Sequence, residues 1–300
     1  MNSPHGLVTV VGEADVADPI LIHSLTGFLD AGSAGRLAVE HLVAELASRP
    51  VAEFDVDVLY DYRARRPRMT FLTDHYGEVD LPELRLDRLV DEAGRAFLLL
   101  HGPEPDFRWR GFSNDAVWLA QHLGVSLVLG VHAVPWPAPH TRPVNVTTHS
   151  NVPELVGDRR AFVGDLEVPG HMAGVLELAM GRADIPAMGF AAHVPHYLSA
   201  SAYPRAAVAL LEAISAQTGL LLPLEGLRQR AREADDDISL QVAGEAENVE
   251  AIRLLEHQYD EYMSRLDQAD GSDDISELDP KDFVDQVEQF LADRDRYDKD

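Results

Sequence analysis

Short hydrophobic runs alternate with amphipathic helical patterns over the first 220 or so residues. The runs at 96–101 and 125–134 are almost uninterrupted, as in strands that are buried on both faces. Shorter strand patterns lie at 7–11, 20–24, 54–60, 69–72, 84–89, 144–148 and 188–194. Helical patterns lie between them, after the loop at 26–35 as far as Pro50, and at 107–123, 170–180 and 203–218. Strands that alternate with helices predict an α/β fold, with a mainly parallel twisted sheet covered by helices on both faces.

The pattern changes twice more along the chain. Four prolines within 135–143 predict an irregular loop, because proline interrupts both ladders and helices. After Pro223, helical patterns occur at 224–243 and 246–265. The last 35 residues hold 13 acidic and 4 basic side chains. We therefore predict an α/β core domain at 1–222, a C-terminal helical extension at 223–265 and an acidic, weakly structured tail at 266–300.

The charge balance narrows the range of partners. The chain carries 51 acidic and 25 basic residues, a formal net charge of −26. A field of that sign repels nucleic acids and anionic membrane surfaces, so we expect neither as a partner. The N-terminus lacks the basic region and apolar core of a secretion signal, and no apolar stretch is long enough to cross a membrane. The expected location is the cytoplasm.

Two residue types are informative because they are rare. Cysteine is absent, which excludes thiolate nucleophiles and cysteine-bound metals. Lysine occurs only at Lys281 and Lys299, so the first 280 residues hold no Schiff-base or phosphate-binding lysine. No histidine–carboxylate spacing typical of a metal centre is present. The sequence predicts no metal and no cofactor, and no catalytic residue can be assigned from it.

The first candidate binding site is the small-residue loop at 30–35. Asp30, Gly32 and Ser33 precede a helix, where backbone N–H groups can approach an anion. The loop has neither a dinucleotide-binding nor a phosphate-loop pattern. The alternative is structural: Asp30 or Ser33 caps the helix, and the glycines allow the turn.

The second candidate lies in the proline-rich loop, where His140 and Arg142 stand between two prolines. The guanidinium of Arg142 could hold a carboxylate or phosphate in a forked contact. The alternative is an internal salt bridge that fixes the loop.

Several histidines form the third candidate, because most of them fall at strand ends or at a helix start. Ligands of doubly wound sheets bind outside the carboxyl ends of the strands. The alternative, which we favour for most of them, is a structural imidazole bonded to the backbone. The histidines are His132, His140, His149, His171, His193 and His196.

Several motifs resemble the proteasome assembly chaperone 2 family of actinobacterial type. They are GFLDAG at 27–32, GPEPDFRW at 102–109, HTRP at 140–143, VPGH at 168–171, GFAAHVPHY at 189–197 and LEHQYD at 255–260. The resemblance implies a phosphorylase/hydrolase-like α/β fold with added C-terminal helices. It also implies a chaperone of assembly. Such chaperones dock on the proteasome through a C-terminal hydrophobic–Tyr–any residue tail, and here Tyr297 is not penultimate and follows Arg296, so docking by this mode is doubtful.

Two functional hypotheses remain. The first is a non-catalytic binding or assembly protein whose partner is another copy of itself, as a homo-oligomer, or another protein. The second is a phosphorylase- or hydrolase-type enzyme for a small anionic or nucleoside-like substrate. Convergence of the segments at 30–35, 132–142, 149 and 193–196 in one pocket would favour the enzyme. Separate or internally packed segments would favour the binding protein.

Overall fold

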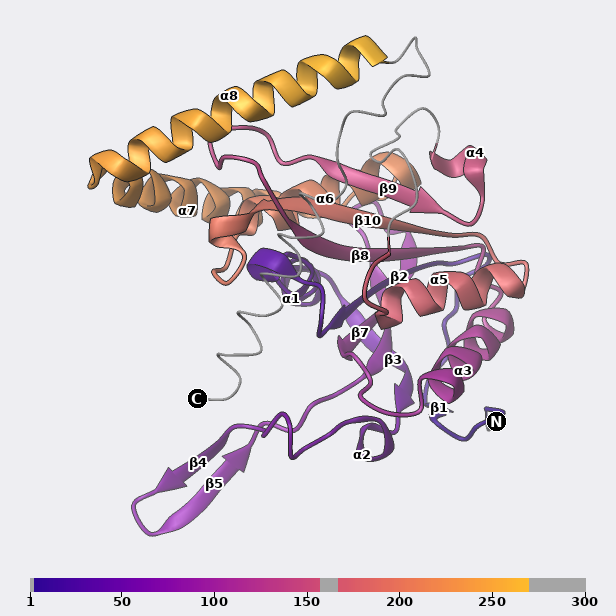
Figure 1. Ribbon diagram of the computed structural model, residues 1–300. Coiled ribbons are helices and arrows are strands. Elements are labelled where there is room, and N and C mark those ends of the chain that lie inside the picture. The colour runs from indigo at the N-terminus through magenta and orange to yellow at the C-terminus, as the bar shows by residue number, and fades with distance from the viewer. Residues whose placement is uncertain (1–2, 157–166, 270–300) are drawn as a thin grey trace.

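The computed structural model describes residues 3–156 and 167–269, and an eight-stranded sheet forms their centre (Figure 1). The strand order is β1-β3-β6-β7-β2-β8-β10-β9. The strands are β1 (Val8–Val10), β2 (Ile20–Thr26), β3 (Ser48–Phe54), β6 (Arg85–Val90), β7 (Ala96–Pro103), β8 (Leu127–Trp136), β9 (Val146–Ser150) and β10 (Ala187–Pro195).

The four central strands β7, β2, β8 and β10 pair in parallel. On one side β6, β3 and β1 continue the sheet with antiparallel pairing, and on the other side β9 pairs antiparallel with β10. The parallel centre and the surrounding helices confirm the predicted α/β class. Of the antiparallel pairs, only β6 and β7 follow each other through a short connection, at 91–95, which a parallel pair could not use.

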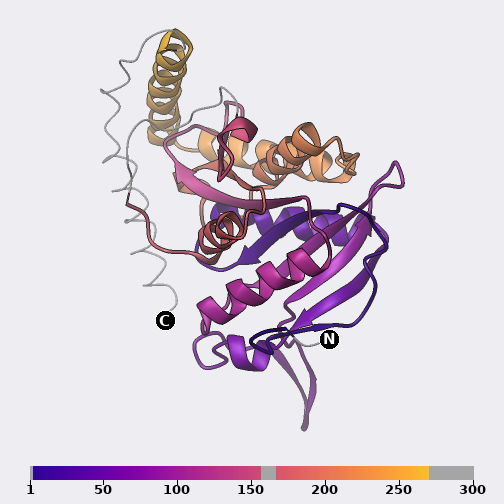
Figure 2. The same cartoon turned by 90° about the vertical axis from the view of Figure 1, so that its right-hand side faces the viewer.

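Helices cover both faces of the sheet. Helices α1 (Ala34–Glu45), α6 (Pro204–Thr218) and the start of α7 (Glu225–Ala243) pack on one face, in a core that includes Phe97, Phe190 and Leu227. Helices α3 (Trp109–His122) and α5 (Met172–Arg182) cover the other face, with Phe54, Phe112 and Leu176. The turned view separates the two layers (Figure 2).

The two runs predicted as buried strands lie inside the sheet, since neither β7 nor β8 is an edge strand. The most buried strand is a third one, β10, in which all nine residues are buried. Its sequence mixes glycine, alanine and histidine with larger apolar residues, so the hydrophobic pattern does not indicate how completely the strand is buried.

The prediction of a strand at 54–60 is wrong. The strand is β3, six residues earlier, and Val56–Leu59 forms the short helix α2. The pattern predicts that the helix extends as far as Pro50, but Pro50 lies within β3, where the register shifts between Pro50 and Ala52. A bulge of this kind tolerates a residue that has no N–H to donate.

The proline-rich segment is also less irregular than predicted at its start. Strand β8 continues through Pro135 to Trp136, and Pro135 pairs in register with Val194 of β10. The chain leaves the sheet only after Trp136.

A two-stranded hairpin extends far from the body of the molecule (Figures 1 and 2). It consists of β4 (Met69–Leu72) and β5 (His75–Val79), which pair only with each other. Every residue from 68 to 81 is exposed, and we call this segment the arm. The pattern at 69–72 predicts a strand, which β4 confirms, but nothing in the pattern indicates that this strand stands outside the main sheet.

The C-terminal extension is helical. Helix α7 packs on α6, and α8 (Ala246–Ala269) crosses above the end of the sheet (Figure 1). Among the side chains of α8 that the structure describes, Tyr259 is the buried one. The short elements η1 (Ala31–Ser33), α4 (Pro153–Val156) and η2 (His196–Leu198) lie in the connections. Most of the predicted acidic tail, 270–300, lies outside the described residues, and the division into three parts stays a prediction. Within residues 3–156 and 167–269, no helix combines the length and apolarity that a membrane span requires.

Candidate functional site

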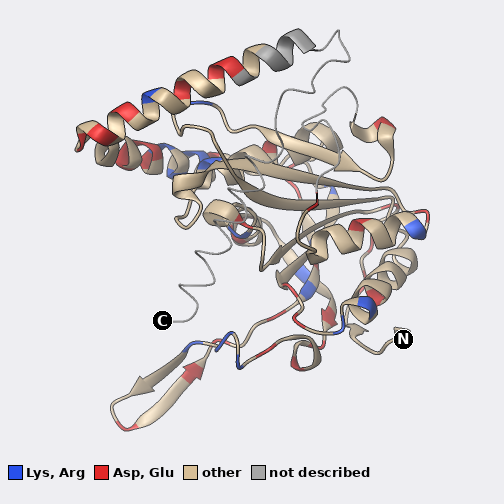
Figure 3. Cartoon of the chain, in the orientation of Figure 1, with Lys and Arg blue, Asp and Glu red and all other residues tan. Residues whose placement is uncertain are grey.

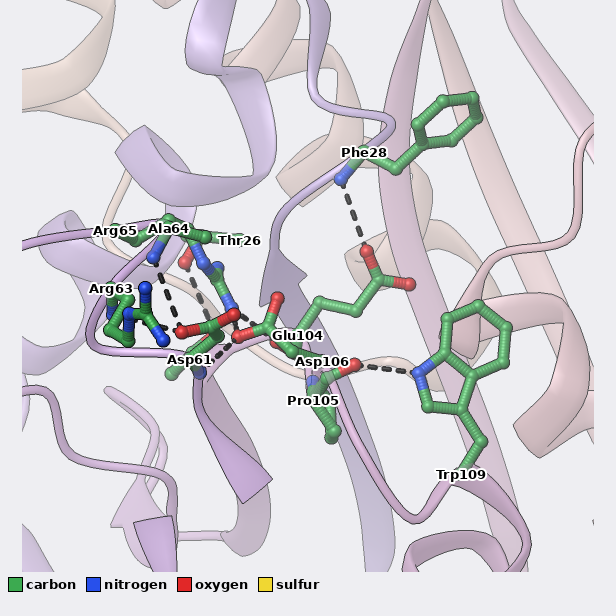
Figure 4. Close-up of polar contacts among 11 residues, drawn as sticks. Thr26, Phe28, Asp61, Arg63, Ala64, Arg65, Glu104, Pro105, Asp106 and Trp109 are labelled. Carbon is green, nitrogen blue, oxygen red and sulfur yellow. Dashed lines mark hydrogen bonds and ion pairs between the residues drawn. The ribbon is translucent and has the colours of Figure 1, made fainter. Parts of the chain in front are cut away.

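Glu104 joins three segments at the carboxyl ends of the parallel strands (Figure 4). It follows β7, and its Oε2 accepts a hydrogen bond of 3.1 Å from the backbone N–H of Phe28, just after β2. Its Oε1 accepts one of 2.5 Å from the N–H of Met172, the first residue of α5. A side chain at Gly27 would overlap this carboxylate, because a Cβ there would lie 2.4 Å from Oε2. Glu104 thus sets the positions of two loops and a helix.

The residues that follow Glu104 fix the same corner from outside. Asp106 accepts hydrogen bonds from the N–H of Asp61 and the guanidinium of Arg65. Arg65 also bonds the carbonyl oxygen of Glu104. Trp109 donates its indole N–H to the carbonyl oxygen of Pro105 at 2.6 Å. The GPEPDFRW motif is therefore a structural joint (Figure 4).

The loop at 30–35 forms a helix cap. The carboxylate of Asp30 accepts hydrogen bonds from the N–H groups of Gly35 (2.6 Å) and Arg36 (3.0 Å). Gly32 has a φ of +64°, and its backbone bonds Ser199 and Tyr203. Ser33 also adopts the left-handed conformation, with a φ of +51°. These contacts match the structural alternative, in which the loop serves its own helix.

Four histidines gather between the sheet and α5. His23 comes from β2, His132 from β8, His149 from β9 and His171 from the start of α5. The ring centroid of His132 lies 5.5 Å from that of His171 and 5.9 Å from that of His149. We call these residues the histidine cluster.

Two glycines make room for the histidine cluster on neighbouring strands. A Cβ at Gly130 would lie 2.9 Å from the His23 ring, and one at Gly189 would lie 2.2 Å from the His149 ring. Strand β8 thus places a glycine and then a histidine on the same face, two residues apart. Each glycine leaves space for the imidazole ring on the neighbouring strand, so the rings of His23 and His149 pack against the sheet.

Burial keeps the inner imidazoles neutral. Burial, together with His171 and His149 nearby, lowers the pKa of His23 to about 4. The same causes hold the pKa of His132 well below its ordinary value. The Nδ1 atoms of His23 and His132 are buried without a hydrogen-bond partner among the described residues. At the rim, His149 pairs with Glu177 of α5, with 2.7 Å between Nδ1 and Oε2.

His193 belongs to a different group, below α8. Its ring stacks on Trp136 at 3.9 Å between centroids, and its Nε2 lies 2.7 Å from the hydroxyl of Thr147. Burial lowers the pKa of His193 to about 3. Tyr259 of α8 packs in the same small cluster as Trp136.

Arg142 makes the internal salt bridges that we had considered as the alternative. Its guanidinium bonds Asp260 at 2.7 and 2.8 Å and Glu256 at 3.1 Å, both on α8. The backbone N–H of His140 donates to the hydroxyl of Tyr197 at 2.8 Å, and the ring Nδ1 of His140 lies 2.8 Å from the same hydroxyl. His196 is exposed at the start of η2.

The predicted residues therefore do not share one pocket. They divide among the helix cap at Asp30, the histidine cluster, the stack of His193 on Trp136 and the junction of Arg142 with α8. Pockets of about 350 and 650 Å³ lie instead beside Glu83 and along the arm, and none of the predicted residues lines them. Among the described residues, no three His, Asp or Glu side chains are placed to hold a metal ion.

Sequence reasoning missed two residues that organise this region. Glu104 lies within a motif that we had singled out, but nothing in the local pattern says that its carboxylate reaches Phe28 and Met172. His23 stands inside the apolar run of β2, and Gly130 two residues before His132 was a signal that a bulky group lies opposite. The two hydrogen bonds of Glu104 join segments more than 60 residues apart, so only the fold reveals them.

Comparison with known proteins places the chain in a family. The PAC2 family model matches residues 24–242. A Mycobacterium tuberculosis protein of unknown function, Rv2714, is 42% identical, with 89% of this chain and 93% of that chain covered and a TM-score of 0.84. No curated protein sequence is significantly similar.

Two further solved structures are similar over most of the chain. The M. tuberculosis proteasome-assembly chaperone homologue Rv2125 is 30% identical, covering 78% of this chain and 99% of its own, with a TM-score of 0.71. Pyrococcus furiosus PbaB, an archaeal proteasome activator, is 19% identical, covering 77% and 96%, with a TM-score of 0.58, and shares the fold. The family model matches 219 residues, more than half of the chain, and this chain therefore belongs to the PAC2 family.

Proposed function

We propose that this protein is a non-catalytic assembly protein of the cytoplasm, chaperone-like, which works as a homo-oligomer. The observation that carries the proposal is the arm, an exposed hairpin with apolar side chains and no partner within the described part of the chain. Membership of the PAC2 family supports the same class of function, since its relative Rv2125 is described as a proteasome-assembly chaperone homologue.

The arm presents one apolar face. Met69 and Phe71 lie two positions apart in β4 and so share a face, and Val79 and Tyr76 are their partners in β5. The rings of Phe71 and Tyr76 meet edge to face at 5.2 Å. Between 40% and 71% of each of these four residues is exposed. A two-stranded hairpin alone is marginally stable in water, so a surface that covers this face would stabilise it.

Charge favours a second copy of the chain as that surface. Arg63, Arg66 and Arg68 lead into the arm and make no ion pair within residues 3–156 and 167–269, whereas the whole chain has a net charge of −26. Acidic residues line α7 and α8, and the basic residues at the root of the arm stand apart from them (Figure 3). The arginines at the root can pair with acidic residues of another copy, while the arm itself also carries Asp74, Glu78 and Asp80 beside its apolar side chains.

The enzyme hypothesis loses its two anion contacts. Asp30 bonds its own helix, and Arg142 bonds two carboxylates of α8.

The arm can be tested by its removal. Arg68 and Asp80 are joined by a backbone hydrogen bond of 2.9 Å, so an Asn-Gly turn can replace residues 69–79 between them without stretching the chain. We expect light scattering to show an oligomer for the full chain and a monomer for the variant, with the melting of the α/β domain unchanged. Leu240→Ser on α7, 72% exposed in the original chain, is the matched control and should keep the oligomer. A monomeric full chain, or an oligomer that survives loss of the arm, would refute the proposal.

A further inference from the structure

Helix α5 begins on an unusual capping residue. The VPGH motif ends at His171, whose Nδ1 accepts a hydrogen bond of 3.3 Å from the backbone N–H of Gly174. Helix N-caps are commonly Ser, Thr, Asp or Asn, whose oxygens accept at any ordinary pH. A histidine nitrogen accepts only when it carries no proton. The cap therefore requires a neutral His171 with its proton on Nε2.

The surroundings of His171 contain several titratable groups. His132 of β8, His149 of β9 and His23 of β2 face it from the sheet. Glu104 faces it from the loop after β7, and Glu177 belongs to α5 itself. From α3, the uncharged Trp109 lies beside Gly170. Three imidazoles and two carboxylates thus determine the cost of a proton on His171.

We propose that His171 is a proton-operated cap of α5, whose protonation releases the first turn of the helix from the sheet. A protonated Nδ1 becomes a donor and faces the N–H of Gly174, another donor. The new positive charge also stands at the positive end of the helix dipole. Both effects act on the same turn, and neither needs the proposed assembly function.

The direction of the pH dependence follows from the surroundings. Burial lowers the pKa of His171 below 6.5, while Glu104 acts in the opposite direction and is outweighed. A histidine whose folded pKa is lowered stabilises the fold above its unfolded pKa, and this stabilisation is lost as the pH falls through the folded value. The cap is therefore complete at neutral pH and is lost when the pH falls through the folded pKa of His171, which lies below 6.5.

Release of the first turn has a defined structural consequence. Met172, which is fully buried, is the first residue of α5, and its N–H is held by Glu104. When the turn opens, Met172 leaves the core and Glu104 keeps only its bond to Phe28. The opening is confined to the start of α5, because Leu176 and Met180 stay buried further along the helix.

Amide exchange of the full-length protein tests the proposal. Between about pH 7.5 and a pH below the folded pKa of His171, protection of the Gly174 and Val175 amides, corrected for intrinsic exchange, should fall about five- to tenfold, the typical loss on removing a cap. His171→Asn keeps an accepting cap without a titration and should change less than about twofold. His171→Ala should be poorly protected at both pH values. His122→Asn, at an exposed position on α3, is the control and should behave as the original chain.

A second measurement does not depend on stability. Nitrogen NMR of labelled histidine should show His171 at neutral pH with a protonated Nε2 and an unprotonated Nδ1. The proposal is overturned if Nδ1 carries the proton at neutral pH, or if His171→Asn retains the pH dependence of the original chain.

Discussion

At the scale of single residues, Glu104 has the largest structural role that one side chain shows in this region. One carboxylate accepts the backbone N–H groups of Phe28 and Met172, and Arg65 holds its carbonyl oxygen. Neither oxygen can be replaced by an amide nitrogen without turning a donor against a donor. The residue therefore couples the ends of β2 and β7 to α5.

We predict that Glu104→Gln lowers the free energy of unfolding by about 1–3 kcal/mol, the cost of leaving a partly buried N–H without its acceptor. Urea denaturation measures this difference. Glu92→Gln removes the same charge at an exposed position and should change the free energy by less than about 0.5 kcal/mol. Equal effects of the two substitutions would show that charge, and not the two hydrogen bonds, explains the result.

At the scale of elements, α8 is held by few contacts. Tyr259 is its buried residue, with its hydroxyl bonded to the carbonyl of Pro143 and to the side chain of Asn145. Arg142 adds the salt bridges to Glu256 and Asp260. Most other described residues of the helix are exposed or half-buried. Local opening of α8 should therefore be easier than unfolding of the sheet.

Arg142→Ala should loosen α8 without unfolding the domain. The guanidinium is 30% exposed and Asp260 is 54% exposed, so water screens the pair and its loss should change the stability of the fold little. Hydrogen exchange of α8 should rise while the melting temperature changes little. Arg253→Ala removes a more exposed contact, 3.7 Å from Glu250, and should leave the exchange of α8 as it was. An unchanged α8 in Arg142→Ala would mean that Tyr259 and the remaining contacts, such as the bond from Thr141 to Glu256, hold the helix without Arg142.

At the scale of the whole molecule, the core does not end where the α/β pattern ends. Leu227 of α7 is fully buried in the core formed by α1, α6 and the sheet, and Ala231 lies beside it. We therefore retain the proposal that 223–265 is an extension on the α/β domain, with a boundary in which α7 completes the packing. The acidic tail contributes 13 acidic and 4 basic residues to the net charge.

Two truncations test the boundaries. Deleting 224–300 removes Leu227, which costs about 2–5 kcal/mol, and should lower the melting temperature by roughly 4 °C or more. Deleting 267–300 should leave melting nearly unchanged. Thermal melting and light scattering compare both with the full chain. If the shorter deletion is as damaging as the longer one, the tail is a docked structural element and the boundary near 266 is misplaced.

The sequence by itself determined the elements whose cause is local. Periodicity located β7, β8, α3, α6 and both C-terminal helices, because burial on two faces or along one stripe leaves a repeating hydrophobic pattern. The family motifs and the absence of lysine from residues 1–280 were also legible without a fold. Alternation misled at 54–60, where a three-residue pattern in Phe54, Val56 and Val58 resembled a strand and the bulge at Pro50 hid the true one.

The tertiary structure decided what depends on segments distant in sequence. Glu104 meets Phe28 across 76 positions, and Arg142 meets Asp260 across 118. The same holds for the three strands and one helix that bring the histidine cluster together. It also holds for the arm, whose apolar pattern resembles that of any other strand although the main sheet does not include it. The local hydrophobic pattern predicts whether a segment forms a strand or a helix. The partner of a hydrogen bond or an ion pair, in contrast, is set by the packing of the whole chain. In this protein that packing gives most of the predicted ligand-binding residues internal partners.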